Sequence, residues 1–434
     1  MTTLKRIFSR SAAGLSEADE IERNILLTVV NGVLFIFAES LLDPTLVLVA
    51  FVSQLTASPF LIGLIVPIYG SASSIPQFWV SGYLQSQPLK IDLYKRMSLI
   101  RCLAWGALAA GINLVTDPDW LLVVFFLTFT TAMSAAGISG LPFLEVLSKT
   151  VPPARRGETF ALRFGVGVLL AIGGSFLVRW MIGPDAPLPF PHNYGLLAII
   201  FFVTVSIALL IYHAVREQPD AIVKPRARSS EQFQRAMEVL RENVNFRRLL
   251  TAESAMIVAN MATPFFAVFV QKELGGDPAW VAIYLGVTLV TNLLSNLFFG
   301  RLSRRIDNQK VLMASAVAGL LMSLVMLSLV LFARPLGISP LAASIWLLPV
   351  FVLSGIRTTG FYISSNSLLL NIAPPADRTL MIGFTQTVIG LLLLLTGLSG
   401  VLVGVFGYAV LFAVTLTAHL TSLIATRKII DVKE

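Results

Sequence analysis

The sequence predicts an all-α, polytopic membrane protein with twelve transmembrane helices in two six-helix halves. Of its 434 residues, 56% are hydrophobic and 13% are charged, and apolar runs recur from Ile25 to Ile430. A spanning helix needs about 20 mainly apolar residues. Because lipid cannot satisfy backbone polar groups, such runs form helices or closed barrels. These runs lack the residue-by-residue alternation of barrel strands, so helices are expected.

The apolar runs define the expected helices in chain order. We place them at about 24–50, 58–84, 94–116, 119–147, 158–182, 192–215, 248–271, 278–300, 309–333, 340–371, 377–403 and 405–427. This divides the chain into an N-terminal tail (1–23), a six-helix bundle (24–215), a linker (216–247), a second bundle (248–428) and a C-terminal tail (429–434).

The linker is the one substantial polar segment between helices. Ser229 or Ser230 can cap a helix there, and apolar residues follow at three- and four-residue steps. They are Phe233, Met237, Leu240 and Val244. We therefore expect an amphipathic helix that joins the two bundles at the inner membrane surface.

Charge predicts the topology. With the N-terminus inside, all but four of the 32 Lys and Arg residues fall on or beside inner segments, as the positive-inside rule requires. The four are Arg179, Lys272, Arg334 and Arg357. We expect a protein of the plasma (inner) membrane with both termini in the cytoplasm. The net charge of +8 then reflects topology, and no nucleic-acid partner is expected.

Several function classes are disfavoured. The polar first 24 residues do not resemble a cleaved secretory signal. A single cysteine, Cys102, excludes an internal disulfide and a thiolate cluster, and the three histidines lie far apart. No phosphate-binding Gly-x-x-x-x-Gly-Lys-Ser/Thr stretch occurs. We therefore expect neither an enzyme nor a metal or other cofactor.

The second half of the sequence repeats features of the first. The matched features are Pro44 and Pro264, Pro59 and Pro278, Gly82 and Gly300, and the Pro-Pro-Ala stretches that begin at Pro152 and Pro374. Their separations all lie between 218 and 222 residues. A steady offset of half the chain indicates two halves related by duplication, about an axis along the membrane normal.

With this repeat and its linker, the chain resembles a transporter of the major facilitator superfamily (MFS) over essentially its whole length. The family's loop signature after helices two and eight is matched by Gly300, Leu302, Ser303 and Arg305, while Arg304 stands at its acidic position and Asp307 at its second glycine. The first-half copy keeps Gly82 and Leu84. The inner segments expected to gate the protein contain Gly82, Gly300, Arg304, Arg305, Asp307, Arg156 and Arg378.

The resemblance implies that helices one, four, seven and ten line a central cavity. Their mid-depth residues, with two neighbours on helix ten, are Glu39, Thr131, Ser134, Asn260, Arg357, Thr358 and Phe361. An ionisable group at mid-depth usually faces a bundle interior, so Glu39 and Arg357 are expected to face one space from opposite halves. They form either a permanent ion pair or a functional site, at which Arg357 binds an anionic group or else Glu39 exchanges a proton.

Asp43 lies one turn beyond Glu39 and precedes Pro44. It is either a polar residue at a proline kink or a second candidate for proton exchange. The hypothesis is a monomeric secondary transporter that moves a small organic solute, anionic or amphipathic, across the bilayer by alternating access. Its coupling ion would be the proton, exchanged at Glu39 or Asp43, with Arg357 as the anion or counter-ion site. The alternative is an MFS-like protein that does not transport and acts as a membrane assembly factor or sensor.

Overall fold

The computed structural model describes residues 17–184, 186–220, 229–302, 307–373 and 378–430. Their regular elements are all helical, which confirms the predicted fold class. The N-terminal half contains α2 (Glu17–Leu41), α3 (Val47–Leu55), α4 (Pro59–Gln85), α5 (Ile91–Leu114), α6 (Pro118–Thr150), α7 (Pro153–Ile182) and α8 (His192–Tyr212). After α9 (Ser229–Glu242), the C-terminal half contains α10 (Val244–Ala259), α11 (Phe265–Leu274), α12 (Trp280–Leu302), α13 (Asn308–Phe332), α14 (Pro340–Ile372), α15 (Arg378–Leu395) and α16 (Ser399–Arg427).

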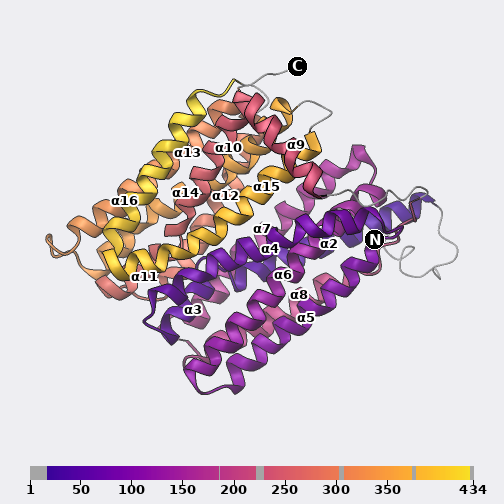
Figure 1. Ribbon diagram of the computed structural model, residues 1–434. Coiled ribbons are helices and arrows are strands. Elements are labelled where there is room, and N and C mark those ends of the chain that lie inside the picture. Colours follow the sequence, from indigo (N-terminus) through magenta and orange to yellow (C-terminus); the bar gives the residue numbers. More distant parts are fainter. Residues whose placement is uncertain (1–16, 185, 221–228, 303–306, 374–377, 431–434) are drawn as a thin grey trace.

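The two halves lie side by side and pack their helices in the same pairs (Figure 1). In the first half α5 packs on α6, α4 on α6, α2 on α8 and α5 on α8. The C-terminal half repeats these contacts as α13 on α14, α12 on α14, α10 on α16 and α13 on α16. Repeated pairing of this kind is what a duplicated six-helix unit produces.

Three helices begin with the same local signal. Ser58, Asp117 and Ser339 each accept backbone hydrogen bonds at the first turn of α4, α6 and α14, and a proline follows each of them. Such side chains satisfy N–H groups that have no partner within the helix, and proline at the first helical position loses no hydrogen bond. These caps fix the residue at which each of the three helices begins.

Two of the predicted helices are broken. The helix expected at 24–50 divides into α2 and α3 around Asp43 and Pro44, and the one expected at 248–271 divides into α10 and α11 around a 3-10 turn at Asn260–Ala262 that precedes Pro264. Proline removes a backbone donor and clashes with the preceding turn. The sequence repeat at Pro44 and Pro264 is therefore a repeat of helix breaks.

Eleven helical stretches of the described chain are long and apolar enough to cross a membrane. One of them, Met381–Arg427, has 47 residues, and at about 1.5 Å per residue it is roughly twice as long as the ~30 Å apolar layer. Gly407 interrupts it with φ 79° and ψ 174°, a conformation that favours glycine. The stretch therefore accounts for two crossings, and its reversal lies at Gly407 instead of the expected position near residue 404.

The start of α2, the end of α16 and α9 lie at one end of the molecule, called here the terminal end; α3 and α11 lie at the opposite, far end (Figure 1). The halves meet closely toward the far end. There α3 packs on α11, and Lys272 donates a hydrogen bond to the carbonyl of Thr56 over 3.0 Å. A Cβ on Gly400 would lie 2.1 Å from the carbonyl oxygen of Pro59, so backbones touch across the two halves.

The linker helix is present as α9 and packs on α15 and α10. Its buried residues are Ala236 and Val239, whereas the expected apolar residues Phe233 and Val244 are exposed. The predicted helix is present, and part of its expected apolar face is packed. Leu240 lies against the apolar cluster that contains Val239, and the ring centre of Phe233 lies 6.1 Å from that of Phe384.

Candidate functional site

A cavity of about 300 Å³ lies inside the N-terminal half. All six membrane-crossing segments of that half contribute to it. Its lining consists of Asn31, Phe35, Glu39, Tyr69, Ser73, Tyr94, Arg101, Met133, Ala136, Gly137, Ser139, Gly140, Phe143, Arg163 and Leu209. It therefore differs from the central cavity expected between helices of both halves.

Arg163 of α7 reaches this cavity because α2 makes room for it. A Cβ on Gly32 would lie 1.9 Å from the Cγ of Arg163. The arginine Nη1 donates to the Asn31 Oδ1 over 2.9 Å and to the carbonyl of Thr28 over 3.3 Å, and its guanidinium lies 4.6 Å from the ring centre of Phe143. Glycine, amide and ring together fix the position of the charge.

Arg101 of α5 lines the same cavity beside Phe35 of α2. Its guanidinium lies 5.2 Å from the ring centre of Phe35, and its charge interacts with that of Glu39. Asn31, Phe35 and Glu39 are four residues apart and so share one face of α2. Four residues rise about 6 Å along a helix, so the two arginines stand roughly one turn apart along α2.

The lining contains two arginines and one carboxylate. Among the described residues, Glu39 has no ion pair within 4 Å, and the Nε of Arg101 is buried without a hydrogen-bond partner. Beyond Glu39 the space narrows to about 10 Å³ lined mainly by apolar side chains, including Leu42, Trp105 and Phe129. Glu39 thus stands where the cavity narrows toward the far end.

Asp43 does not line the cavity. Its Oδ1 accepts hydrogen bonds from the Thr45 N and Oγ1 atoms and from the Leu46 N, over 2.9, 2.6 and 2.9 Å. These bonds stabilise the turn between α2 and α3, as an aspartate commonly does before a helix. The geometry favours the structural interpretation of Asp43 over proton exchange.

On α6 the cavity is lined by a different face from the one expected. The residues that line it include Met133, Gly137 and Gly140. Thr131 is exposed and donates to the carbonyl of Leu127, and Ser134 is not in the lining. Sequence placed the right helix at the site but did not fix its rotation.

The structure does not place Arg357 in the lining of the cavity that contains Glu39. Arg357 is buried in the C-terminal half, where its backbone carbonyl accepts a hydrogen bond from Ser315. Its Cδ lies 3.0 Å from the position a Cβ would take on Gly319, and the ring of His419 lies 2.3 Å from that same position. Arg357 therefore extends into the contact between α13, α14 and α16.

The other expected site residues of the C-terminal half are also apart from the cavity. Thr358 is exposed, and Phe361 packs against an apolar cluster that includes Phe246 and Leu368. Asn260 lies at the break between α10 and α11, with a buried Oδ1 that has no hydrogen-bond partner. None of the three lines the cavity of the N-terminal half.

The expected gating residues lie at helix ends. Gly82 and Gly300 are in the last turns of α4 and α12, and Arg378 begins α15; Arg304 and Arg305 lie outside the described residues. Asp307 precedes α13 and pairs with Lys310 over 3.2 Å. Arg156 donates to the carbonyls of Val151 and Ser148 over 3.1 and 2.5 Å, which caps the end of α6.

An ion-pair network that was not predicted from the sequence lies at the terminal end of the first half. Lys149 of α6 pairs with Glu217 and Asp220, each over 2.7 Å, and Lys90 pairs with Asp220 over 3.0 Å. Glu217 also accepts from the backbone N of Lys90 and Ile91 at the start of α5. The hydrogen bond from Lys149 lowers the pKa of Asp220 below its ordinary value. The network ties the linker's first residues to α5 and α6.

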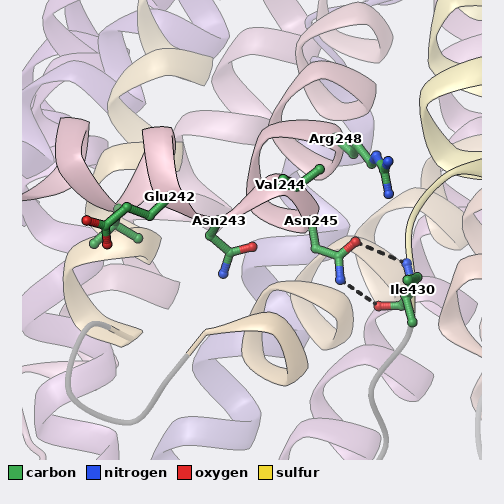
Figure 2. A pocket seen from close by; sticks show the side chains of 7 residues that line it. Glu242, Asn243, Val244, Asn245, Arg248 and Ile430 are labelled. Carbon is green, nitrogen blue, oxygen red and sulfur yellow. Dashed lines mark hydrogen bonds between the residues drawn. The ribbon is translucent and has the colours of Figure 1, made fainter.

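A second hollow, of about 510 Å³, lies on the C-terminal half at the same end. Figure 2 shows Asn245 facing the backbone of Ile430, with Glu242 on the other side of the hollow. The two hydrogen bonds between Asn245 and Ile430 measure 3.4 and 3.3 Å, and Arg248 donates to the carbonyl of Lys428. These contacts tie the chain after α16 to α10 and do not gather buried charge.

Sequence reasoning missed Arg101 and Arg163 because it counted them among charges beside inner loops. Each stands ten residues after the first residue of its helix, Ile91 and Pro153 respectively. The apolar spans of the two helices begin at Ile91 and Glu158, so at about 1.5 Å per residue Arg101 lies roughly 15 Å and Arg163 roughly 7.5 Å inside them. That depth was the available signal, since an arginine inside the apolar layer usually faces a bundle interior.

Comparisons with known proteins agree with this architecture. Solved structures similar to this chain include a D-xylose-proton symporter (TM-score 0.70, 14% identity, 95% of this chain and 99% of that one). Others are the nucleoside transporter NupG (0.61, 16%, 93% and 97%) and an inward-facing bacterial homologue of the iron transporter ferroportin (0.65, 14%, 94% and 98%). Identities this low support the fold alone. A comparison with curated protein sequences finds no match.

The family model described as Major Facilitator Superfamily matches residues 28–332, more than half of the chain. With the helical bundle and its long apolar helices, this match makes the chain an integral membrane protein and not an enzyme. It is a membrane transporter that belongs to the major facilitator superfamily.

Proposed function

We propose that the protein is a secondary transporter that moves a small organic solute by alternating access, with its site in the N-terminal cavity and Glu39 as the proton-exchanging group. The observation that carries this proposal is the cavity shared by Glu39 and Arg101. A carboxyl group that gains and loses a cationic neighbour during a cycle changes its affinity for protons. Proton movement would in this way depend on which side the site faces.

The groups around Glu39 support this role. The titratable or charged side chains that share the cavity are Tyr69 from α4, Tyr94 and Arg101 from α5, and Arg163 from α7. Asp43 lies one turn further along the chain but is bound in the turn before α3. Among the residues that the structure describes, Glu39 is therefore the one carboxylate in the lining.

The positive-inside rule places the terminal end in the cytoplasm of the cell. The contacts between α3 and α11, and between Lys272 and Thr56, are then on the outer side. We infer from this an inward-facing state, in which rocking of the halves would open the far end.

The test begins with a thermal-shift screen of purified protein against single sugars, nucleosides, amines and carboxylates, because a ligand that binds the folded state raises its apparent stability. The compound that stabilises most is then used in proteoliposomes, both in counterflow and in uptake driven by a pH gradient. We expect Glu39→Gln to keep counterflow and to lose the effect of the gradient.

Asp43→Asn is the matched control, since asparagine can form the same turn before α3, and it should keep both fluxes. Gradient-driven uptake that persists in Glu39→Gln would remove Glu39 from the coupling role. Absence of flux for every stabilising compound would favour the non-transporting alternative, an assembly factor or sensor.

A further inference from the structure

The lining of the N-terminal cavity carries an excess of positive charge. Arg101 and Arg163 face one carboxylate, Glu39, and arginine stays protonated in proteins. Asp43 is not part of this lining and lies in the turn before α3, where Thr45 and Leu46 donate hydrogen bonds to its carboxylate. With Glu39 ionised, one further negative charge would balance the charges of the lining; with Glu39 protonated, two positive charges would face an incoming anion.

Both arginines have donors available for that charge. The Arg101 side chain is buried, and its Nε has no hydrogen-bond partner, which is costly for a polar group. Arg163 uses Nη1 for its bonds to Asn31 and Thr28, and a guanidinium has five N–H donors in all. Its planar fork matches a carboxylate in two-point hydrogen bonding.

The remainder of the cavity is apolar or small. Phe35 and Phe143 cover the faces of the two guanidiniums, and the α6 and α8 walls carry Met133, Ala136 and Leu209. A volume of about 300 Å³ lies at the lower end of the range for small-molecule sites. The site therefore fits a small ligand that has a charged end and an apolar body.

We propose that the N-terminal cavity binds a small monocarboxylate with an apolar body, whose carboxylate is held by Arg101 and Arg163. This inference rests on the proposed function and specifies its substrate class. The solute carboxylate and the Glu39 carboxylate compete for Arg101. A proton on Glu39 ends that competition, so one proton and one anion enter the site together.

Benzoate, benzamide and benzylamine are the probes, because they share a ring and differ in charge, and acetate tests the apolar body. Binding to purified protein is measured by thermal shift and by calorimetry. We expect benzoate to bind at least tenfold more tightly than benzamide, a difference of about 1.4 kcal/mol, since hydrogen bonds between charged groups are stronger than those of a neutral amide. Benzylamine should not bind, and acetate should bind more weakly than benzoate.

Arg101→Met and Arg163→Met should each weaken benzoate binding at least tenfold. Arg101→Lys, which keeps the charge but loses the fork, should show an intermediate loss. Arg179→Met is the matched control, because Arg179 lies exposed in the last turn of the same helix as Arg163, and it should bind benzoate as the unchanged protein does. Thermal unfolding in the absence of ligand identifies any variant that fails to fold.

Equal binding of benzamide and benzoate, or benzoate binding that survives both arginine substitutions, would overturn the substrate class. Counterflow with labelled benzoate separates this outcome from failure of the transport proposal. Benzoate that binds through both arginines but gives no flux supports the ligand class and contradicts transport. Flux of another solute that Arg101→Met leaves unchanged supports transport and contradicts the ligand class.

Discussion

The two halves pair their helices alike but bury charge differently. In the N-terminal half Glu39, Arg101 and Arg163 surround one cavity. In the C-terminal half the buried charges lie in separate helix contacts: Glu253 accepts a hydrogen bond from Ser365, and Arg357 packs beside Gly319. Duplication thus preserved the frame of helices, while the polar positions diverged within it.

The helix breaks illustrate that divergence. The offset of 220 residues that relates Pro44 to Pro264 also relates Glu39 to Ala259. A charged residue in one half therefore corresponds to a neutral one in the other, next to Asn260. A buried charge needs a partner or a role, and only the N-terminal half gathers its charges around space for a ligand within the described residues.

A pair of glycines offers the strongest test of this difference. Gly32 makes room for Arg163, and Gly319 makes room for His419 and Arg357. Alanine at either position would press on these side chains, and overpacking typically costs about 1–3 kcal/mol. We expect both substitutions to lower the melting temperature, but only Gly32→Ala to lose benzoate binding, at least tenfold, because it displaces Arg163 from Asn31.

Gly165→Ala on α7 is the control for a helical glycine, since a Cβ there would meet nothing within 4 Å. It should leave binding unchanged and unfold at the same temperature or a higher one, since alanine favours the helix. Loss of ligand binding in Gly319→Ala as well would mean that the C-terminal half takes part in the site.

The sequence was sufficient for the helices and their repeat, because apolar length and proline position act locally. It was not sufficient for the site, because that depends on how each helix is rotated. Thr131 and Met133 are two residues apart on α6, yet the first is exposed and the second lines the cavity. Likewise, the depth of Arg357 was correctly read as unusual, but the side chain's direction toward α13 depends on the packing at Gly319.

Arg357 gives the next prediction. Among the described residues it has no acidic partner within 4 Å, and its Nε is buried without a hydrogen bond. Replacing a buried ion pair with apolar side chains of similar size is often neutral or stabilising by about 1–4 kcal/mol, and an unpaired buried charge has no pair attraction to lose. We expect Arg357→Met to unfold at the same temperature or a higher one and to retain transport.

Arg101→Met should behave in the opposite way in a flux assay, because its partner charge and its ligand both lie in the cavity. A parallel measurement of both variants in proteoliposomes makes the comparison. Lost transport in a stably folded Arg357→Met would return Arg357 to the role that the sequence first suggested.

The smallest expected effect concerns the contacts at the terminal end that hold the chain segments after α8 and after α16. These contacts are ion pairs in the first half and amide hydrogen bonds in the second. The pKa of Asp220 lies below its ordinary value of 3.8 because Lys149 and Lys90 bond to it. A lowered pKa stabilises the folded state above about pH 4, and this stabilisation is lost as the pH falls through the lowered value. Asp220→Asn should therefore reduce the free energy of unfolding at neutral pH by no more than about 1 kcal/mol, since the pair is partly exposed. The difference should disappear once the pH is low enough to protonate Asp220 in the folded protein as well. Asn245→Ala, which removes the amide tie to Ile430, should give a loss that does not change over the same range, as measured by thermal unfolding at each pH. A pH-independent loss in Asp220→Asn would show that its ion pairs add nothing beyond hydrogen bonding. The contrast between the two halves would then fail.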